Sequence, residues 1–121
     1  MARSRVCVDW IMDSLRKESM DKAPDSTEVD PVGHKIVFEN DHVRVLEVRS
    51  PSGQQIPMHS HPPRVVVPVG SYRLKSISPT GDDSTVDRRP GEAVWVESEE
   101  HQAEILIGPT HVIEVEIKSA R

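Results

Sequence analysis

Three histidines are the residues of this sequence best suited to chemistry. His59 and His61 stand two positions apart, and His101 stands 40 positions after His61. Side chains along a strand alternate between its two faces, so His59 and His61 would point to the same side. Neutral imidazoles that share a face can bind one metal ion. A third imidazole from another strand would complete such a set.

His101 is the best candidate for that third imidazole. It alternates with the apolar residues Ala103, Ile105 and Ile107, so a strand there would place the histidine on the buried face. The other three histidines are interpreted as ordinary core or surface residues. One of them, His111, remains an alternative third ligand, because it shares its alternate positions with apolar residues: Ile113, Val115 and Ile117.

The elements that must position these histidines are expected to be short strands. Aromatic residues make up 3% of the chain, so valine, isoleucine and leucine must form the core, and β-branched residues favour sheets. Turn residues recur about every 8–12 positions, which is typical of a sandwich or small barrel. The expected strands cover residues 35–39, 42–49, 56–61, 64–69, 72–77, 85–88, 93–96, 101–107 and 111–118.

The chain is expected to divide near Pro31. Residues 1–31 are interpreted as an N-terminal helix and linker, and residues 32–121 as one all-β domain. Apolar residues recur at helical spacing within residues 5–18, which predicts a short helix. A frayed tail is the alternative. A length of 121 residues suits a single core.

Composition excludes several classes of protein. The net charge of −5 provides no basic surface for nucleic acid. No apolar run approaches the ~20 residues that span a bilayer, so no membrane partner is expected. Cys7 is the single cysteine, which excludes an intrachain disulfide and favours a reducing compartment. We expect a cytoplasmic protein.

Two segments of the sequence resemble the motifs of the cupin superfamily. Residues 53–61 place a glycine, five residues and then His-x-His, and residues 91–101 place a glycine, a strand, a turn and a histidine. The resemblance covers roughly residues 35–118. It implies a double-sheet jelly roll, that is, an antiparallel β-sandwich or barrel. It also implies His59, His61 and His101 as the metal ligands.

The sequence departs from the cupin pattern in three places. The family's glutamate is missing after the second histidine, where Val65 and Val66 stand. Glu97 and Glu99 replace the proline and glycine of the second motif, and Ile105 replaces an asparagine. The run that includes Glu97 is interpreted as a solvated turn, and Glu97 as the carboxylate that could instead reach the metal or act as a base. No general base is assigned.

A site of three neutral imidazoles leaves the charge of a divalent ion uncompensated, which favours an anionic chelating ligand. This ligand set resembles those of acetylacetone and thiol dioxygenases. The resemblance implies an enzyme, a non-haem Fe(II) dioxygenase-like oxidoreductase acting on a small anionic chelating substrate. Zinc, nickel, manganese and copper remain alternatives. The alternative function is a non-catalytic cupin module that binds a metal or small ligand, or whose site is vestigial.

Three further residues could contribute to such a site. Arg64 could face an anionic substrate or lie on the surface, and Tyr72 or Trp95 could line the pocket or pack elsewhere. We also expect a homodimer, through an edge strand or through the apolar residues of the N-terminal segment.

Overall fold

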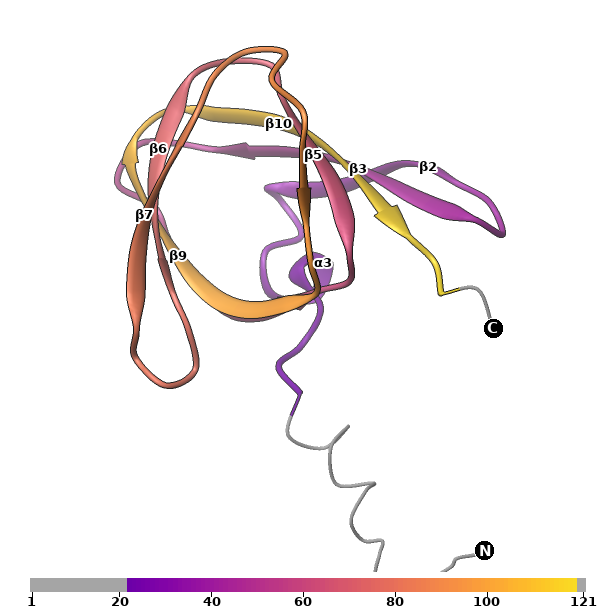
Figure 1. Ribbon diagram of the computed structural model, residues 1–121, viewed down its shortest axis with the longest axis horizontal. Helices are drawn as coiled ribbons and strands as arrows, with labels where there is room; N and C mark the ends of the chain where they lie inside the picture. The colour runs from indigo at the N-terminus through magenta and orange to yellow at the C-terminus, as the bar shows by residue number, and fades with distance from the viewer. Residues whose placement is uncertain (1–21, 120–121) are drawn as a thin grey trace, which may run out of the picture.

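The structure is a computed structural model that describes residues 22–119, and this part of the chain contains nine strands and one short helix (Figure 1). Each of the nine strands begins and ends within two residues of its predicted bounds. The helix is α3 Ser26–Val29. The strands are β2 His34–Glu39, β3 Val43–Ser50, β4 Gln55–His61, β5 Arg64–Pro68, β6 Tyr72–Ile77, β7 Asp83–Arg88, β8 Val94–Val96, β9 Glu99–Ile107 and β10 Thr110–Ile117.

The strands form two antiparallel sheets that face each other. One sheet has the order β2-β3-β10-β5-β8, and the other has the order β4-β9-β6-β7. Figure 1 shows both sheets curving around a common interior. Each sheet contains neighbours that are distant in sequence: β10 pairs with both β3 and β5, and β9 pairs with both β4 and β6. The predicted all-β double-sheet jelly roll is therefore confirmed.

Two turns explain why each of the two sequence motifs begins with a glycine. Gly53 precedes β4 with a φ of +87°, and Gly91 precedes β8 with a φ of +77°. Residues with a side chain rarely adopt this conformation, whereas glycine adopts it freely. Both are the glycines that begin the two sequence motifs, so their role is to turn the chain into the strands that follow.

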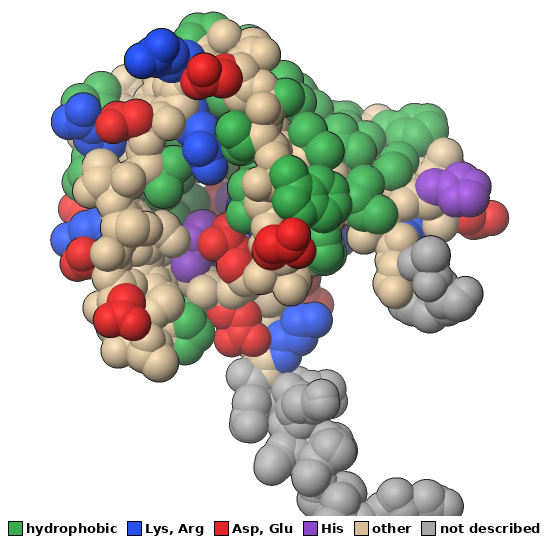
Figure 2. Space-filling view, viewed as in Figure 1, with side chains coloured by type: hydrophobic (Ala, Val, Ile, Leu, Met, Phe, Trp, Pro, Cys, Tyr) green, Lys and Arg blue, Asp and Glu red, His purple; other side chains and the backbone are tan. Residues whose placement is uncertain are grey.

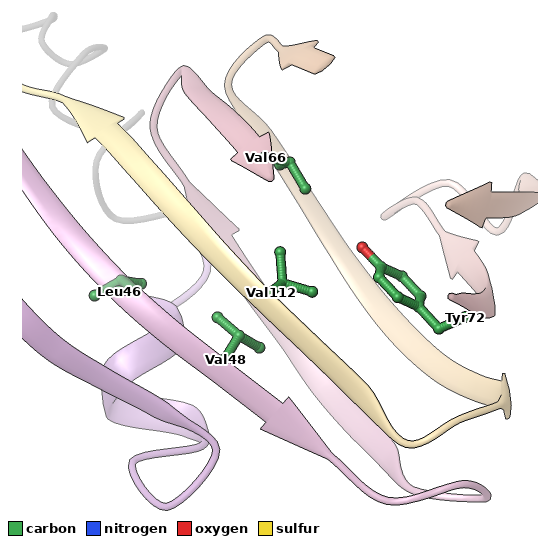
Figure 3. Packing of buried hydrophobic residues seen from close by; sticks show 5 residues of the cluster. All are labelled: Leu46, Val48, Val66, Tyr72 and Val112. Carbon is green, nitrogen blue, oxygen red and sulfur yellow. The ribbon is translucent and has the colours of Figure 1, made fainter. Parts of the chain in front are cut away.

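The apolar core fills one part of the space between the sheets. Leu46 and Val48 of β3, Val66 of β5 and Val112 of β10 meet Tyr72 of β6 from the opposite sheet (Figure 3). All five are at most 7% exposed. Burying an aliphatic side chain of this size stabilises the fold by about 1.5–3 kcal/mol. This cluster therefore holds the sheets together.

Inward-facing residues change from apolar to charged along three neighbouring strands. Val48 pairs with Val112 at one level, and Leu46 pairs with Glu114 at the next. At the level beyond, Glu116 pairs with one arginine on each side, Arg44 of β3 and Arg64 of β5. The interior thus has an apolar half and a charged half.

The segment before β2 packs on the barrel. Ser60 of β4 donates its backbone N–H to the carbonyl of Pro24 at 2.8 Å, and Ser26 is fully buried. Asp25 caps α3 by accepting from the Thr27 backbone. The helix predicted over residues 5–18 lies outside the described residues. The helix among residues 22–119 has four residues, so none of the described helical structure could span a bilayer.

Candidate metal centre

The register of β4 against β9 brings the three predicted histidines together. His59 lies directly opposite His101, and His61 lies two residues along the same face of β4. One ring nitrogen from each lies within 4.8 Å of the other two. The three residues are 1%, 4% and 7% exposed for His59, His61 and His101. The geometry is therefore that of three imidazoles converging on one point in the interior.

Neighbouring groups orient two of these rings. His59 Nδ1 lies 2.7 Å from the carbonyl oxygen of Pro57, and because a carbonyl only accepts, Nδ1 carries the proton and Nε2 keeps its lone pair. His101 Nδ1 lies 2.7 Å from Ser76 Oγ on β6. Metal-binding histidines usually engage their second nitrogen in this way, which fixes the ring and its tautomer. Both Nε2 atoms are left free to coordinate.

Burial keeps the three rings in the state that binds a metal. Desolvation lowers the pKa of His59 and of His61 below the usual value for histidine. It also lowers the pKa of His101 to about 4, and nearby Glu99 opposes that change only in part. Imidazole must be neutral to coordinate. The three rings are therefore neutral, and able to coordinate a metal, at neutral pH.

Two glutamates of β10 lie beside this centre, and the sequence did not predict them. Glu114 Oε1 lies 3.8 Å from His61 Nδ1, and Glu116 Oε2 lies 4.0 Å from it. Both glutamates are at least nine-tenths buried. Each has a guanidinium partner: Arg44 Nε donates to Glu116 at 2.6 Å, and Arg64 Nε lies 3.3 Å from Glu114. Burial raises the pKa of Glu116.

A fourth histidine also reaches the site. His34 of β2 is 4% exposed, and its ring centroid lies 6.0 Å from that of His59 and 6.2 Å from that of His61. Its Nδ1 lies 3.1 Å from Asp30 Oδ2, which orients the ring. From the sequence, His34 is interpreted as an ordinary core or surface residue, because a lone histidine in an apolar strand usually is one. Its pairing with Val48, an inward-facing residue, is what turns it inside.

The structure decides between three pairs of alternatives that the sequence left open. His111 is no alternative ligand, because it lies on the outer face of β10 with its Nε2 2.7 Å from Glu47 Oε2. Glu97 does not reach the histidines: it is exposed and accepts a hydrogen bond of 2.7 Å from Trp95 Nε1. Of the two large rings, Tyr72 lines the interior and Trp95 is 52% exposed. Burial raises the pKa of Tyr72 to about 12.

The histidines open onto a cavity of about 280 Å³ between the sheets. Its lining mixes aliphatic and polar side chains: Arg64, Glu99 and Glu114 lie among the histidines, and Ser50, Arg88 and Thr110 line other parts of the cavity. Figure 2 shows a histidine at the floor of a hollow on this face, with acidic side chains next to it. This volume suits a small molecule, since drug-sized ligands occupy about 300–1,000 Å³.

The donor set fits a divalent metal ion. His61 Nδ1, Glu114 Oε1 and Glu116 Oε2 are buried and have no hydrogen-bond partner among the described residues, although buried polar groups are normally satisfied. A dipositive ion held by the three imidazoles would lie close to these two carboxylates, whose charge would offset part of its own. The three histidines are therefore a candidate site for a divalent metal.

Comparison with solved structures identifies similar proteins. A cupin domain from Bordetella pertussis is 28% identical, with a TM-score of 0.63 over 81% of this chain and 98% of that one. A cupin superfamily protein from Desulfitobacterium hafniense is 11% identical, with a TM-score of 0.54 over 71% and 76%. A cupin-2 domain protein from Shewanella frigidimarina is 13% identical, with a TM-score of 0.51 over 85% and 90%. No family model and no curated protein matches the sequence.

Proposed function

We propose that this chain, which belongs to the cupin superfamily, is a metal-dependent enzyme. The activity that we propose is that of a non-haem Fe(II) dioxygenase-like oxidoreductase, and its substrate is a small anionic molecule that chelates the metal. One observation carries the proposal: three buried imidazoles, with ring nitrogens within 4.8 Å of one another, stand at one end of an internal cavity.

His59, His61 and His101 would hold the metal. Pro57 and Ser76 fix two of the rings before any metal binds, so less conformational freedom is lost on binding. Three neutral ligands leave coordination positions open for other molecules. Fe(II), when bound, would supply the redox chemistry that joins a substrate to oxygen.

The cavity would select and protect the substrate. Ile56, Leu74 and Ile105 line it beside the histidines, and apolar walls strengthen electrostatic attraction between a metal and an anion by excluding water. Because the ligands are neutral imidazoles, and because Arg44 and Arg64 balance the charges of Glu116 and Glu114, an anionic substrate is favoured over a neutral one. The volume of about 280 Å³ limits that substrate to a small molecule.

The alternative function is a non-catalytic cupin module that binds a metal or a small ligand. One observation favours it: the two buried carboxylates nearest the histidines, Glu114 and Glu116, both have arginine partners. Each arginine engages a carboxylate oxygen that a general base would use, so neither glutamate is well placed to take a proton from a substrate. A binding protein needs no such base.

The test begins with metal analysis of the full chain purified without added metal. Oxygen uptake is then measured with β-diketones and small thiols as candidate substrates, with the His111→Ala variant as a control of matched residue type. One iron per chain and substrate-dependent oxygen uptake would support the enzyme. Bound metal without uptake would support the binding module, and a protein that binds no added Fe(II) would contradict the metal site.

A further inference from the structure

Arg64 is a buried cation whose hydrogen-bonding capacity is only partly used. Its side chain is 5% exposed, and it lines the cavity from β5. Its Nη2 donates to Glu99 Oε2 at 2.9 Å, and its Nε lies 3.3 Å from Glu114 Oε1. Its Nη1 is buried and has no partner among the described residues. An unpaired buried donor normally costs free energy, so a group that accepts from Nη1 would stabilise the site.

The two carboxylates that contact Arg64 also stand beside the histidines. Glu114 Oε1 lies 3.8 Å from His61 Nδ1, and Glu99 Oε1 lies 3.8 Å from His101 Nδ1. An anion that takes the place of either carboxylate would therefore lie next to the candidate metal ligands. The guanidinium is the right donor for it, because its planar fork matches a carboxylate.

Glu99 differs from Glu114 in its access to solvent. Its side chain is 30% exposed, whereas that of Glu114 is 9% exposed. Glu99 lines both the internal cavity and a separate outer hollow, which Lys22, Pro79 and Glu100 also line. Glu99 thus stands at the boundary between the interior and the surface, where it can turn outward and be hydrated.

We propose that Arg64 binds a carboxylate group of the substrate, and that Glu99 occupies the guanidinium until this carboxylate replaces it. The inference rests on the proposed function in that it names the group by which the small anion is recognised. The substrate would then be a molecule that bears a carboxylate. Glu99, at the mouth of the cavity, would compete with that carboxylate for Arg64.

The exchange leaves the buried charge unchanged. One carboxylate leaves Arg64 and another arrives, so the interior gains no uncompensated charge, which would otherwise be costly. Glu114 remains in place beside Arg64 Nε throughout. The incoming carboxylate can also accept from Nη1, which Glu99 does not. The substrate therefore gains a hydrogen bond that the built-in anion lacks.

The test uses malonate as the probe and neutral malonamide as its uncharged counterpart. Binding is measured by calorimetry on the full chain as purified and after loading with Co(II). The variants are Arg64→Gln, Arg64→Lys and Glu99→Gln. The control is Arg73→Gln, which breaks an exposed ion pair with Asp87; neither of these residues lines the cavity. Circular dichroism checks that each variant is folded.

Substitution of Arg64 and substitution of Glu99 should change the affinity for malonate in opposite directions. Arg64→Gln should weaken malonate binding about 10–100-fold, the worth of a charge-assisted hydrogen bond. Arg64→Lys, which keeps the charge without the fork, should weaken it by about tenfold. Glu99→Gln should strengthen it about fivefold, because the competing anion is gone. Arg73→Gln should bind malonate with the affinity of the wild type. The affinity for malonamide should not change in this way in any variant.

Unchanged malonate affinity in Arg64→Lys, or weaker affinity in Glu99→Gln, would overturn the inference. If Arg64→Gln does not fold, Arg64→Lys and Glu99→Gln still decide it. Cobalt uptake reports separately on the proposed function: a chain that takes up no cobalt contradicts the metal site, whereas the malonate titration of the protein as purified still tests Arg64 and Glu99.

Discussion

The two halves of the barrel interior differ sharply although the same strands build them. Along β10 the inward-facing residues run from Val112 to Glu114 and Glu116, and along β5 they run from Val66 to Arg64. The apolar half packs the two sheets together, whereas the charged half surrounds the three histidines. One half supplies stability and the other holds groups that can bind a metal and an anion.

In a barrel that holds a functional site, an inward-facing side chain need not be apolar. On β10 the buried positions include Thr110, Glu114 and Glu116, while Ile113 and Val115 face outward. A rule that assigns apolar residues to the core therefore inverts this strand. Such local violations of patterning are expected where a function requires buried polar groups.

The largest effect on the fold should come from the apolar half. Leu46 is fully buried in the core cluster, so Leu46→Ala should lower the free energy of unfolding by about 2–5 kcal/mol. Urea unfolding would measure the change, with Ile107→Ala, at a position 55% exposed, as the control. The variant should keep the metal content of the wild type. If Leu46→Ala lost metal while its free energy of unfolding stayed unchanged, the assignment of stability to one half and metal binding to the other would be wrong.

Acid should destabilise the metal-free protein through the charged half. The pKa of His101 is lowered to about 4 from the ordinary 6.5, so below pH 6.5 the unfolded chain binds a proton that the folded chain does not. Stability is therefore full above pH 6.5 and falls as pH drops toward about 4, by about 2 kcal/mol near pH 5. Glu116, whose pKa is raised, contributes with the opposite sign.

Urea unfolding at several pH values, compared between the wild type and His101→Gln, isolates the histidine contribution. The variant should lose less stability than the wild type between pH 6.5 and about 5. Equal pH dependence in the two proteins would show that burial does not suppress protonation of His101.

A smaller effect is expected from a residue that orients a ligand. Ser76 Oγ lies 2.7 Å from His101 Nδ1, and removal of such partners lowers metal affinity by about 10–100-fold. We expect Ser76→Ala to lie near the lower limit, about tenfold, because water can replace a hydroxyl. Competition with a chelator would measure the affinity, and Ser84→Ala, from another serine of the cavity lining, is the control. Equal affinity in both variants would refute the role.

The fold could be predicted because its signals are local. Turn residues separate short runs of β-branched residues, and each of the nine strands lies where that rhythm places it. The convergence of His59, His61 and His101 also followed from alternation along strands together with the motif spacing. The division at residue 31, homodimer formation and cytoplasmic localisation stay predictions.

The remaining part of the site could not be predicted, because it depends on pairing between distant strands. Glu114 lies beside His61 only because β10 pairs with β5, across an interval of almost fifty residues. His34 turns inward through its pairing with Val48. The missing glutamate after His61 was visible in the sequence, but nothing local indicated that carboxylates would come from β10.

The central claim is that three buried histidines bind one metal ion, and His101→Ala beside His111→Ala tests it most directly. Metal content per chain would be measured for both variants and the wild type after loading with Fe(II). We expect one ion per chain in the wild type and in His111→Ala, which changes only the outer face. We expect little or no metal in His101→Ala, His59→Ala and His61→Ala. Full metal content in His101→Ala, or its loss in His111→Ala, would contradict the account.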